Sequence, residues 1–140
     1  MYPMKSAAAA AQLYGAAAGT SPVAELVEVH DGMIAKLAEA LRAIADGRIE
    51  DRLHLTHKVA AVVDVLQMSL DHAQGGEVAA NLDRLYSYFA KRLSDINLKN
   101  DPAICDELKA RLTELRDGWR AVAGGPPAAV PTAAGASLSA

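Results

Sequence analysis

The sequence is poor in several residue types, and each shortage argues against a class of protein. A single cysteine, Cys105, cannot form an internal disulfide, and this fits a reducing cytosol. The net charge of −3 argues against a nucleic-acid surface, which needs clustered lysine and arginine. No window holds the roughly 20 strongly apolar residues of a spanning helix, so we expect no membrane insertion. Gln12, Tyr14 and Gly15 interrupt the N-terminal alanine run, which is therefore a poor export signal.

What the 140-residue sequence has in quantity is alanine, which favours helix because it loses no side-chain entropy there. No segment alternates with period two over a useful length, so we expect no strands. Cap residues followed by proline, at Ser21-Pro22 and Asp101-Pro102, each predict a helix start. Glycine and proline positions then predict four helices, which end near residues 45, 72, 97 and 123, with the second beginning at 49 and the third at 75.

Each predicted helix carries apolar residues three and four positions apart, the pattern of a stripe that faces a core. The stripes are Leu26, His30, Met33, Leu37, Leu41 and Ile44; Leu55, Val59, Val62, Leu66 and Leu70; Val78, Leu82, Leu85, Phe89, Leu93 and Ile96; and Ile104, Leu108, Leu112, Leu115, Trp119 and Val122. Together they predict an all-α fold, an antiparallel up-down four-helix bundle over residues 20–123. We expect a short mobile helical segment over residues 1–19 and a disordered tail over residues 124–140.

Two sets of apolar residues fall outside these stripes. Ala61, Val65 and Met68 form a second stripe on the second helix and predict a groove for another helix, although a dimer contact or an ordinary exposed surface would give the same pattern. On the third helix, Tyr86 lies between Ala79 and Ala90. These three residues form a shoulder beside the stripe that either packs against a neighbouring helix or contacts a partner. The hydroxyl of Tyr86 favours a position that is hydrated or hydrogen-bonded.

The sequence offers little for catalysis. His54 and His57 are spaced to share a helical face, but both fall off the core stripe, and no Glu-x-x-His motif accompanies them. His30 is alone on its stripe and is interpreted as a hydrogen-bonded core or rim histidine. No phosphate loop or nucleophile motif is present. We therefore expect no enzyme activity, no metal and no cofactor, and keep a metal-binding bundle enzyme only as a remote alternative.

The segment GGEVAANLDRLYSYFAKRLSDINLKND, residues 75–101, resembles the third helix of the FliS family of flagellin export chaperones. Ser21-Pro22, Asp31-Gly32 and Trp119 also lie at the spacing of that family, and the resemblance covers about residues 14–122. The matching residues of the segment are Gly75, Gly76, Glu77, Asn81, Leu82, Leu85, Tyr86, Tyr88, Arg92, Leu93, Asn97, Asn100 and Asp101.

The resemblance implies a cytosolic protein that binds the C-terminal segment of flagellin, prevents its premature polymerisation and presents it to the flagellar type III export gate. Amphipathic cargo would lie along exposed apolar stripes, with Ala61, Val65, Met68 and Tyr86 as candidate contacts. The alternative is a helical adaptor of the same fold that binds another export component or a regulator. A homodimer is also compatible with the exposed stripe.

The resemblance further implies that a mobile N-terminal segment can cover the cargo groove, and Leu13 and Tyr14 match it here. A short alanine-rich helix is marginal alone and should dock and undock readily. This chain departs from the family at Glu25, Glu28 and His30, where apolar or aromatic residues are common. Cargo contacts on that side of the first helix are therefore expected to differ, or to shift toward the second helix.

Overall fold

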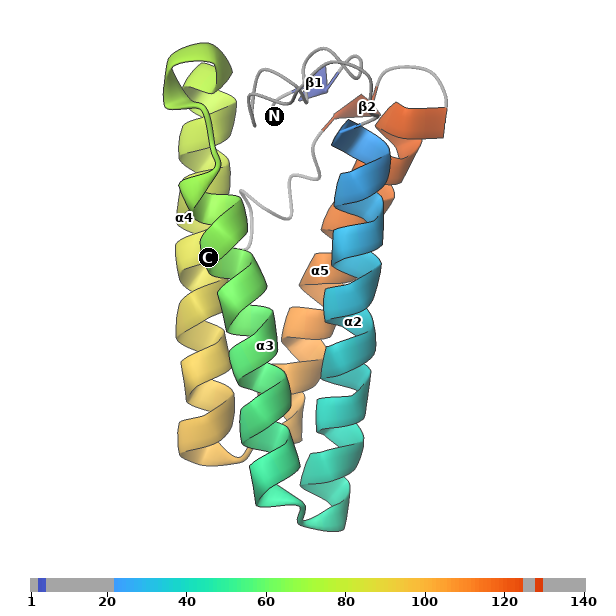
Figure 1. The fold of residues 1–140 in the computed structure, drawn as a ribbon, viewed down its shortest axis with the longest axis vertical. Helices are drawn as coiled ribbons and strands as arrows, with labels where there is room; N and C mark the ends of the chain where they lie inside the picture. The colour runs from blue at the N-terminus through green and yellow to red at the C-terminus, as the bar shows by residue number, and fades with distance from the viewer. Residues whose placement is uncertain (1–2, 5–21, 125–127, 130–140) are drawn as a thin grey trace.

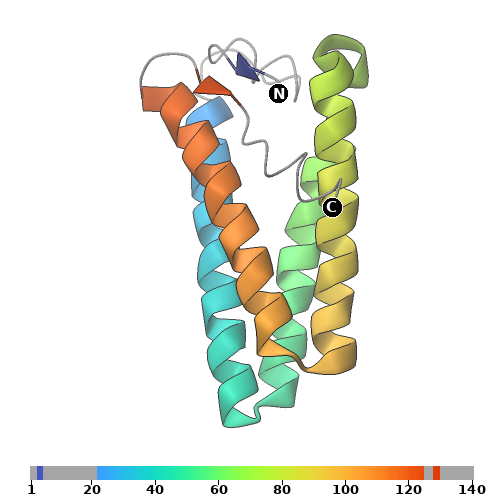
Figure 2. The same ribbon diagram turned by 180° about the vertical axis from the view of Figure 1, so that it is seen from behind.

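A computed structural model of the chain describes residues 3–4, 22–124 and 128–129 (Figure 1). Four helices make up almost all of this part: α2 (Pro22–Asp46), α3 (Ile49–Met68), α4 (His72–Lys99) and α5 (Pro102–Gly124). Successive helices run in opposite directions, and α2 and α4 each pack against both α3 and α5. The view from behind shows the same arrangement, with α5 beside α2 and α4 beside α3 (Figure 2). The predicted antiparallel up-down bundle is confirmed.

The turn between α2 and α3 was predicted at Asp46-Gly47, and the structure confirms it. Gly47 has a φ of 71°, which a glycine adopts without the steric cost that a Cβ brings. The Arg48 amide then donates to the Ala43 carbonyl over 2.8 Å and satisfies one of the free carbonyls at the helix end.

The boundary between α3 and α4 differs from the prediction, because α3 ends at Met68 and α4 already begins at His72. The Asp71 carboxylate caps the new helix by accepting a hydrogen bond from the Gln74 amide over 3.0 Å. The glycine pair nevertheless interrupts the helix as predicted. Gly76 takes a non-helical φ of 54° and ψ of −130°, which kinks α4 after its first turn and separates that turn from the long helix that follows.

The turn between α4 and α5 is capped on both sides, as the Asp101-Pro102 signal predicts. Asn100 ends α4 in the left-handed conformation with a φ of 51°, and its amide donates to the Ile96 carbonyl. The Asp101 carboxylate then accepts from the Ala103 amide over 2.9 Å, which stabilises the first turn of α5.

One core runs the length of the bundle, and three of the four predicted stripes face it. Every member of the α5 stripe is buried, and so are five of the six on α4 and four of the six on α2. The other three, Leu41, Ile44 and Val78, are partly buried and pack against the same cluster. The largest fully buried side chains are those of Trp119, Tyr86, Phe89, Met33 and Leu37.

The stripe predicted for α3 is partly wrong. Val59 and Leu66 are buried as expected, but Leu55 and Val62 are only partly buried, and Val63 is 1% exposed in place of Val62. The reason is that α3 also buries Arg52 and Thr56, which are polar. The core-facing line of α3 therefore reads Arg52, Thr56, Val59, Val63 and Leu66.

Outside the helices, a two-residue strand β1 (Pro3–Met4) pairs antiparallel with β2 (Ala128–Ala129). This pair is the one exception to the expected absence of strands within the described ranges, and it is too short to show any alternation. Most residues of the two predicted flexible ends, 1–19 and 124–140, lie outside the described residues. The predicted division of the chain into two flexible ends and a central bundle therefore stays a prediction. No helix in the described part has the length and apolar character needed to cross a membrane.

Candidate functional site

A groove of about 500 Å³ opens between α2 and α3. Its walls are almost entirely apolar, and two of the residues predicted as partner contacts, Ala61 and Val65, lie in it. Val65 is 61% exposed, which is unusual for a valine and leaves it available to an incoming side chain. The lining consists of Glu28, Val29, Gly32, Met33 and Lys36 from α2 and Ala61, Val62, Val65 and Leu66 from α3.

Gly32 keeps part of this groove open. It lies within α2, and a Cβ built on it would meet no atom within 4 Å. Packing against another helix therefore does not require a glycine here, although a glycine inside a helix costs roughly 1 kcal/mol relative to alanine. The space beyond its Cα is continuous with the groove that Val29 and Val65 line.

The groove also carries one acidic and one basic residue, Glu28 and Lys36. Glu28 is exposed and Lys36 is half-buried. No ion pair or hydrogen bond joins either side chain to another described residue, whereas Asp31, on the same helix, pairs with Arg116 over 2.9 Å and with Arg120 over 3.7 Å. Both side chains that line the groove are thus available to a ligand.

The remaining predicted contacts fall in different places. Met68 is 77% exposed at the end of α3, beyond the residues that line the groove. The expectation that Tyr86 lies on a free shoulder is wrong, because Tyr86 is 0% exposed and packs edge-on against Phe89 with ring centroids 6.3 Å apart. Leu13 and Tyr14 lie outside the described residues, so their role stays a prediction.

A second, smaller groove of about 270 Å³ lies between α3 and α4. Leu98, at its edge, is 78% exposed, and Ala90 is exposed beside it. Its base is polar, because Thr56 and Asn97 belong to a hydrogen-bonded network that ties α3 to α4. The α3 helix therefore borders an open groove on each side.

That network accounts for two residues of the matching segment. The buried Arg52 guanidinium donates through Nε to Asn97 Oδ1 over 3.1 Å and through Nη1 to Asn100 Oδ1. Asn97 Nδ2 donates in turn to Thr56 Oγ1 over 2.8 Å. Buried polar groups that are satisfied in this way fix the relative position of the helices that carry them. Asn97 and Asn100 therefore help to fix α4 against α3.

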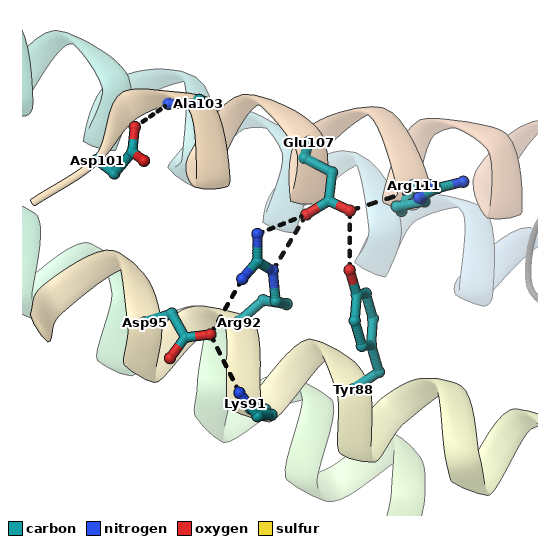
Figure 3. Close-up of polar contacts among 8 residues, drawn as sticks. All are labelled: Tyr88, Lys91, Arg92, Asp95, Asp101, Ala103, Glu107 and Arg111. Carbon is teal, nitrogen blue, oxygen red and sulfur yellow. Dashed lines mark hydrogen bonds and ion pairs between the residues drawn. The ribbon is translucent and has the colours of Figure 1, made fainter. Parts of the chain in front are cut away.

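A second network joins α4 to α5 and accounts for more of the segment (Figure 3). The Glu107 carboxylate accepts hydrogen bonds from Arg92 over 3.1 Å and from the Tyr88 hydroxyl over 2.8 Å. Arg92 also pairs with Asp95 over 3.1 Å. Burial, reinforced by the Glu107 carboxylate, raises the pKa of Tyr88, so its hydroxyl remains a donor at neutral pH.

The histidines have the placement expected of them. His54 and His57 are exposed, and the buried His30 donates from Nδ1 to the Leu26 carbonyl over 2.7 Å. Burial lowers the pKa of His30 from 6.5 to about 4, so the ring is neutral at physiological pH. Its Nε2 has no hydrogen-bond partner among the described residues. Within this same part of the chain, no three His, Cys, Asp or Glu residues gather closely enough to hold a metal ion.

Comparison with known proteins relates this arrangement to one family. The family model of the flagellar protein FliS matches residues 4–126. The flagellar secretion chaperone FliSB of Pseudomonas aeruginosa is 39% identical over 88 residues, which are 63% of this chain and 70% of that protein. The flagellar secretion chaperone FliS of Salmonella typhimurium is 30% identical over 100 residues, 70% of this chain and 74% of its own length.

A third relative extends the match along the chain. The flagellar secretion chaperone FliS of Escherichia coli is 28% identical over 123 residues, 86% of this chain and 90% of that protein. Four residues of the matching segment, Tyr88, Arg92, Asn97 and Asn100, take part in the two networks between the helices. The four-helix bundle is the fold that the resemblance implies. The chain belongs to the FliS family of flagellar secretion chaperones.

Proposed function

We propose that this protein is a cytosolic chaperone that binds the C-terminal segment of flagellin, prevents its premature polymerisation and delivers it to the flagellar type III export apparatus. The observation that carries the proposal is the groove between α2 and α3, with its apolar lining and the exposed Val65. Membership of a family whose named members are flagellar secretion chaperones supports the same conclusion.

The groove suits a helix better than an extended peptide. A helix presents apolar side chains at i, i+3, i+4 and i+7, and such a stripe fills a groove between two parallel walls. Both walls here are helices, so no sheet edge is on offer for an added strand. A cargo segment that folds on binding also loses roughly 2–5 kcal/mol of the interaction energy to ordering, which an apolar contact of this kind can offset.

We propose no catalytic role for the groove. Its two charged residues, Glu28 and Lys36, are eight positions apart on α2, or about 12 Å along the helix axis. Proton transfer between catalytic groups requires hydrogen-bond distances, so this pair does not form an acid and base couple. Apolar contact with a segment of another protein is what the lining offers.

A helical adaptor for another export component or a regulator is the second candidate, and Glu28 is the observation that favours it. An exposed carboxylate lies in the groove at a position where the FliS resemblance leads us to expect an apolar or aromatic residue. A partner other than flagellin would be one whose basic side chain meets Glu28.

The two candidates separate in a binding experiment with Gly32 variants. A Gly32→Leu side chain would start where an added Cβ meets no atom within 4 Å and would occupy part of the groove. It should therefore leave the fold intact and reduce binding of the flagellin C-terminal segment at least tenfold by calorimetry. Gly32→Ala is the matched control and should bind within about twofold of the wild type. If the wild-type protein does not bind the flagellin segment but does bind another flagellar protein, the second candidate function, that of a helical adaptor, is correct.

A further inference from the structure

The groove between α2 and α3 has a direction as well as a shape. Apolar contact alone does not set the direction of a bound helix, but the groove also carries two opposite charges at different heights. Glu28 lies toward the start of α2, and Lys36 lies about two turns further along the same helix. Neither side chain is paired with another described residue, so a bound segment would meet one acidic end and one basic end.

A helix is itself polar along its axis. Its N-terminus carries a partial positive charge and its C-terminus a partial negative charge. An acidic side chain is therefore favourable near the N-terminus, and a basic side chain is favourable near the C-terminus. A helix in the groove is therefore more stable with its N-terminus near Glu28 and its C-terminus near Lys36. In this orientation it runs parallel to α2 and antiparallel to α3.

We propose that Glu28 and Lys36 fix the direction of the bound cargo helix. The inference rests on the proposed function and deepens it by stating how the partner is oriented. The bound segment is an amphipathic helix of about three turns whose N-terminal end lies at Glu28 and whose C-terminal end lies at Lys36. Its apolar residues lie between these ends and contact Val29 and Val65.

The expected effect is modest, because the charges lie at the edge of an open groove. A charge near a helix terminus changes a binding constant by roughly two- to fivefold. Removal of both charges should thus weaken binding by about tenfold at low ionic strength. Because salt screens exposed charges, the loss should shrink to about twofold near 0.5 M salt.

The first test is the double variant Glu28→Gln with Lys36→Gln, which removes both charges and keeps the net charge. Its matched control, Glu114→Gln with Lys109→Gln, makes the same two changes on α5, which does not line the groove. Affinity for the flagellin C-terminal segment is measured by calorimetry at low and high salt. A tenfold, salt-sensitive loss in the first variant and less than a twofold change in the control support the proposal.

The second test reads the direction itself. A nitroxide is attached to a cysteine introduced at Glu25 or at Glu39, which are exposed near the two ends of the groove. Cys105 does not compete for the label, because it is buried and its pKa is raised to about 11. The Glu25→Cys label should broaden the NMR signals of the N-terminal half of the bound segment, and the Glu39→Cys label those of its C-terminal half.

The outcomes separate this inference from the proposed function. The opposite broadening pattern, or full affinity after removal of the two charges, overturns the assigned direction while flagellin binding stands. A charge removal that alters only self-association of the protein shows that a second copy occupies the groove, and the inference is then wrong. If the wild-type protein does not bind the segment, the proposed function fails, and the inference fails with it.

Discussion

Val65→Asp is the substitution that most directly tests whether the exposed face of α3 binds a partner. Val65 is 61% exposed in the free protein, so the folded state loses little packing when the side chain changes. Surface substitutions of this kind alter the free energy of unfolding by about 0.5 kcal/mol. The melting temperature should therefore shift by no more than about 4 °C for a domain of this size.

The effect on binding should be much larger. Covering a valine in an interface contributes about 1–2 kcal/mol from the apolar area removed from water. A carboxylate in the same place loses that contribution and also its hydration, which costs about 1–3 kcal/mol or more. Together these changes predict that the affinity for the flagellin C-terminal segment falls about a hundredfold.

Val63→Asp is the matched control, because it is the same change two residues away on the same helix. Val63 is 1% exposed in the core, so an unpaired charge there should destabilise the protein by about 3 kcal/mol or more. Val62 is less suitable, because it is partly buried and also lines the groove. Thermal melting and calorimetry are measured for both variants. If Val65→Asp melts as low as Val63→Asp, or if it binds flagellin as the wild type does, the reasoning is refuted.

Three further predictions concern the ends, the buried histidine and the polar network. Removal of residues 1–19 should leave the helical circular dichroism intact and leave flagellin binding equal or tighter, and a large loss of affinity would show that Leu13 and Tyr14 belong to the site. Burial lowers the pKa of His30, so the folded state resists protonation, and the free energy of unfolding should fall by about 3 kcal/mol as the pH drops from 6.5 to 4. Urea unfolding at several pH values checks this, and His30→Gln should flatten the dependence of stability on pH. Arg52→Ala should cost about 2–3 kcal/mol in urea unfolding because it leaves Asn97 and Asn100 without their donor, whereas Arg48→Ala, which removes an exposed guanidinium, should cost no more than about 1 kcal/mol.

The sequence predicts the parts of this fold where polarity and burial agree. All six apolar residues of the α5 stripe are buried, because each one recurs at helical spacing and faces the core. On α3 the two diverge. Arg52 and Thr56 occupy core-facing positions, and the partner side chain that satisfies both of them, that of Asn97, comes from α4, more than 40 positions along the chain. A periodicity of apolar residues cannot detect a buried arginine, so the predicted stripe was displaced to Val62.

The candidate site was predicted from one wall only. Ala61 and Val65 were identified because they form an apolar stripe on a single helix. Val29 and Lys36 were not identified, because they become part of the site only when α2 packs beside α3. Tyr86 was misplaced for a related reason. Its hydroxyl suggested a wet position, but the ring is enclosed by the core and packs against Phe89.

The open space beside Gly32 has a consequence for engineering this protein. Gly32→Ala should raise the melting temperature, because alanine has the better helix propensity and its Cβ would meet no atom within 4 Å. Laboratory selection for heat resistance alone would therefore favour a side chain at this position, and a side chain longer than that of alanine would take up room that the cargo needs. Libraries built on this scaffold need a binding screen beside the thermal one, with residue 32 held constant.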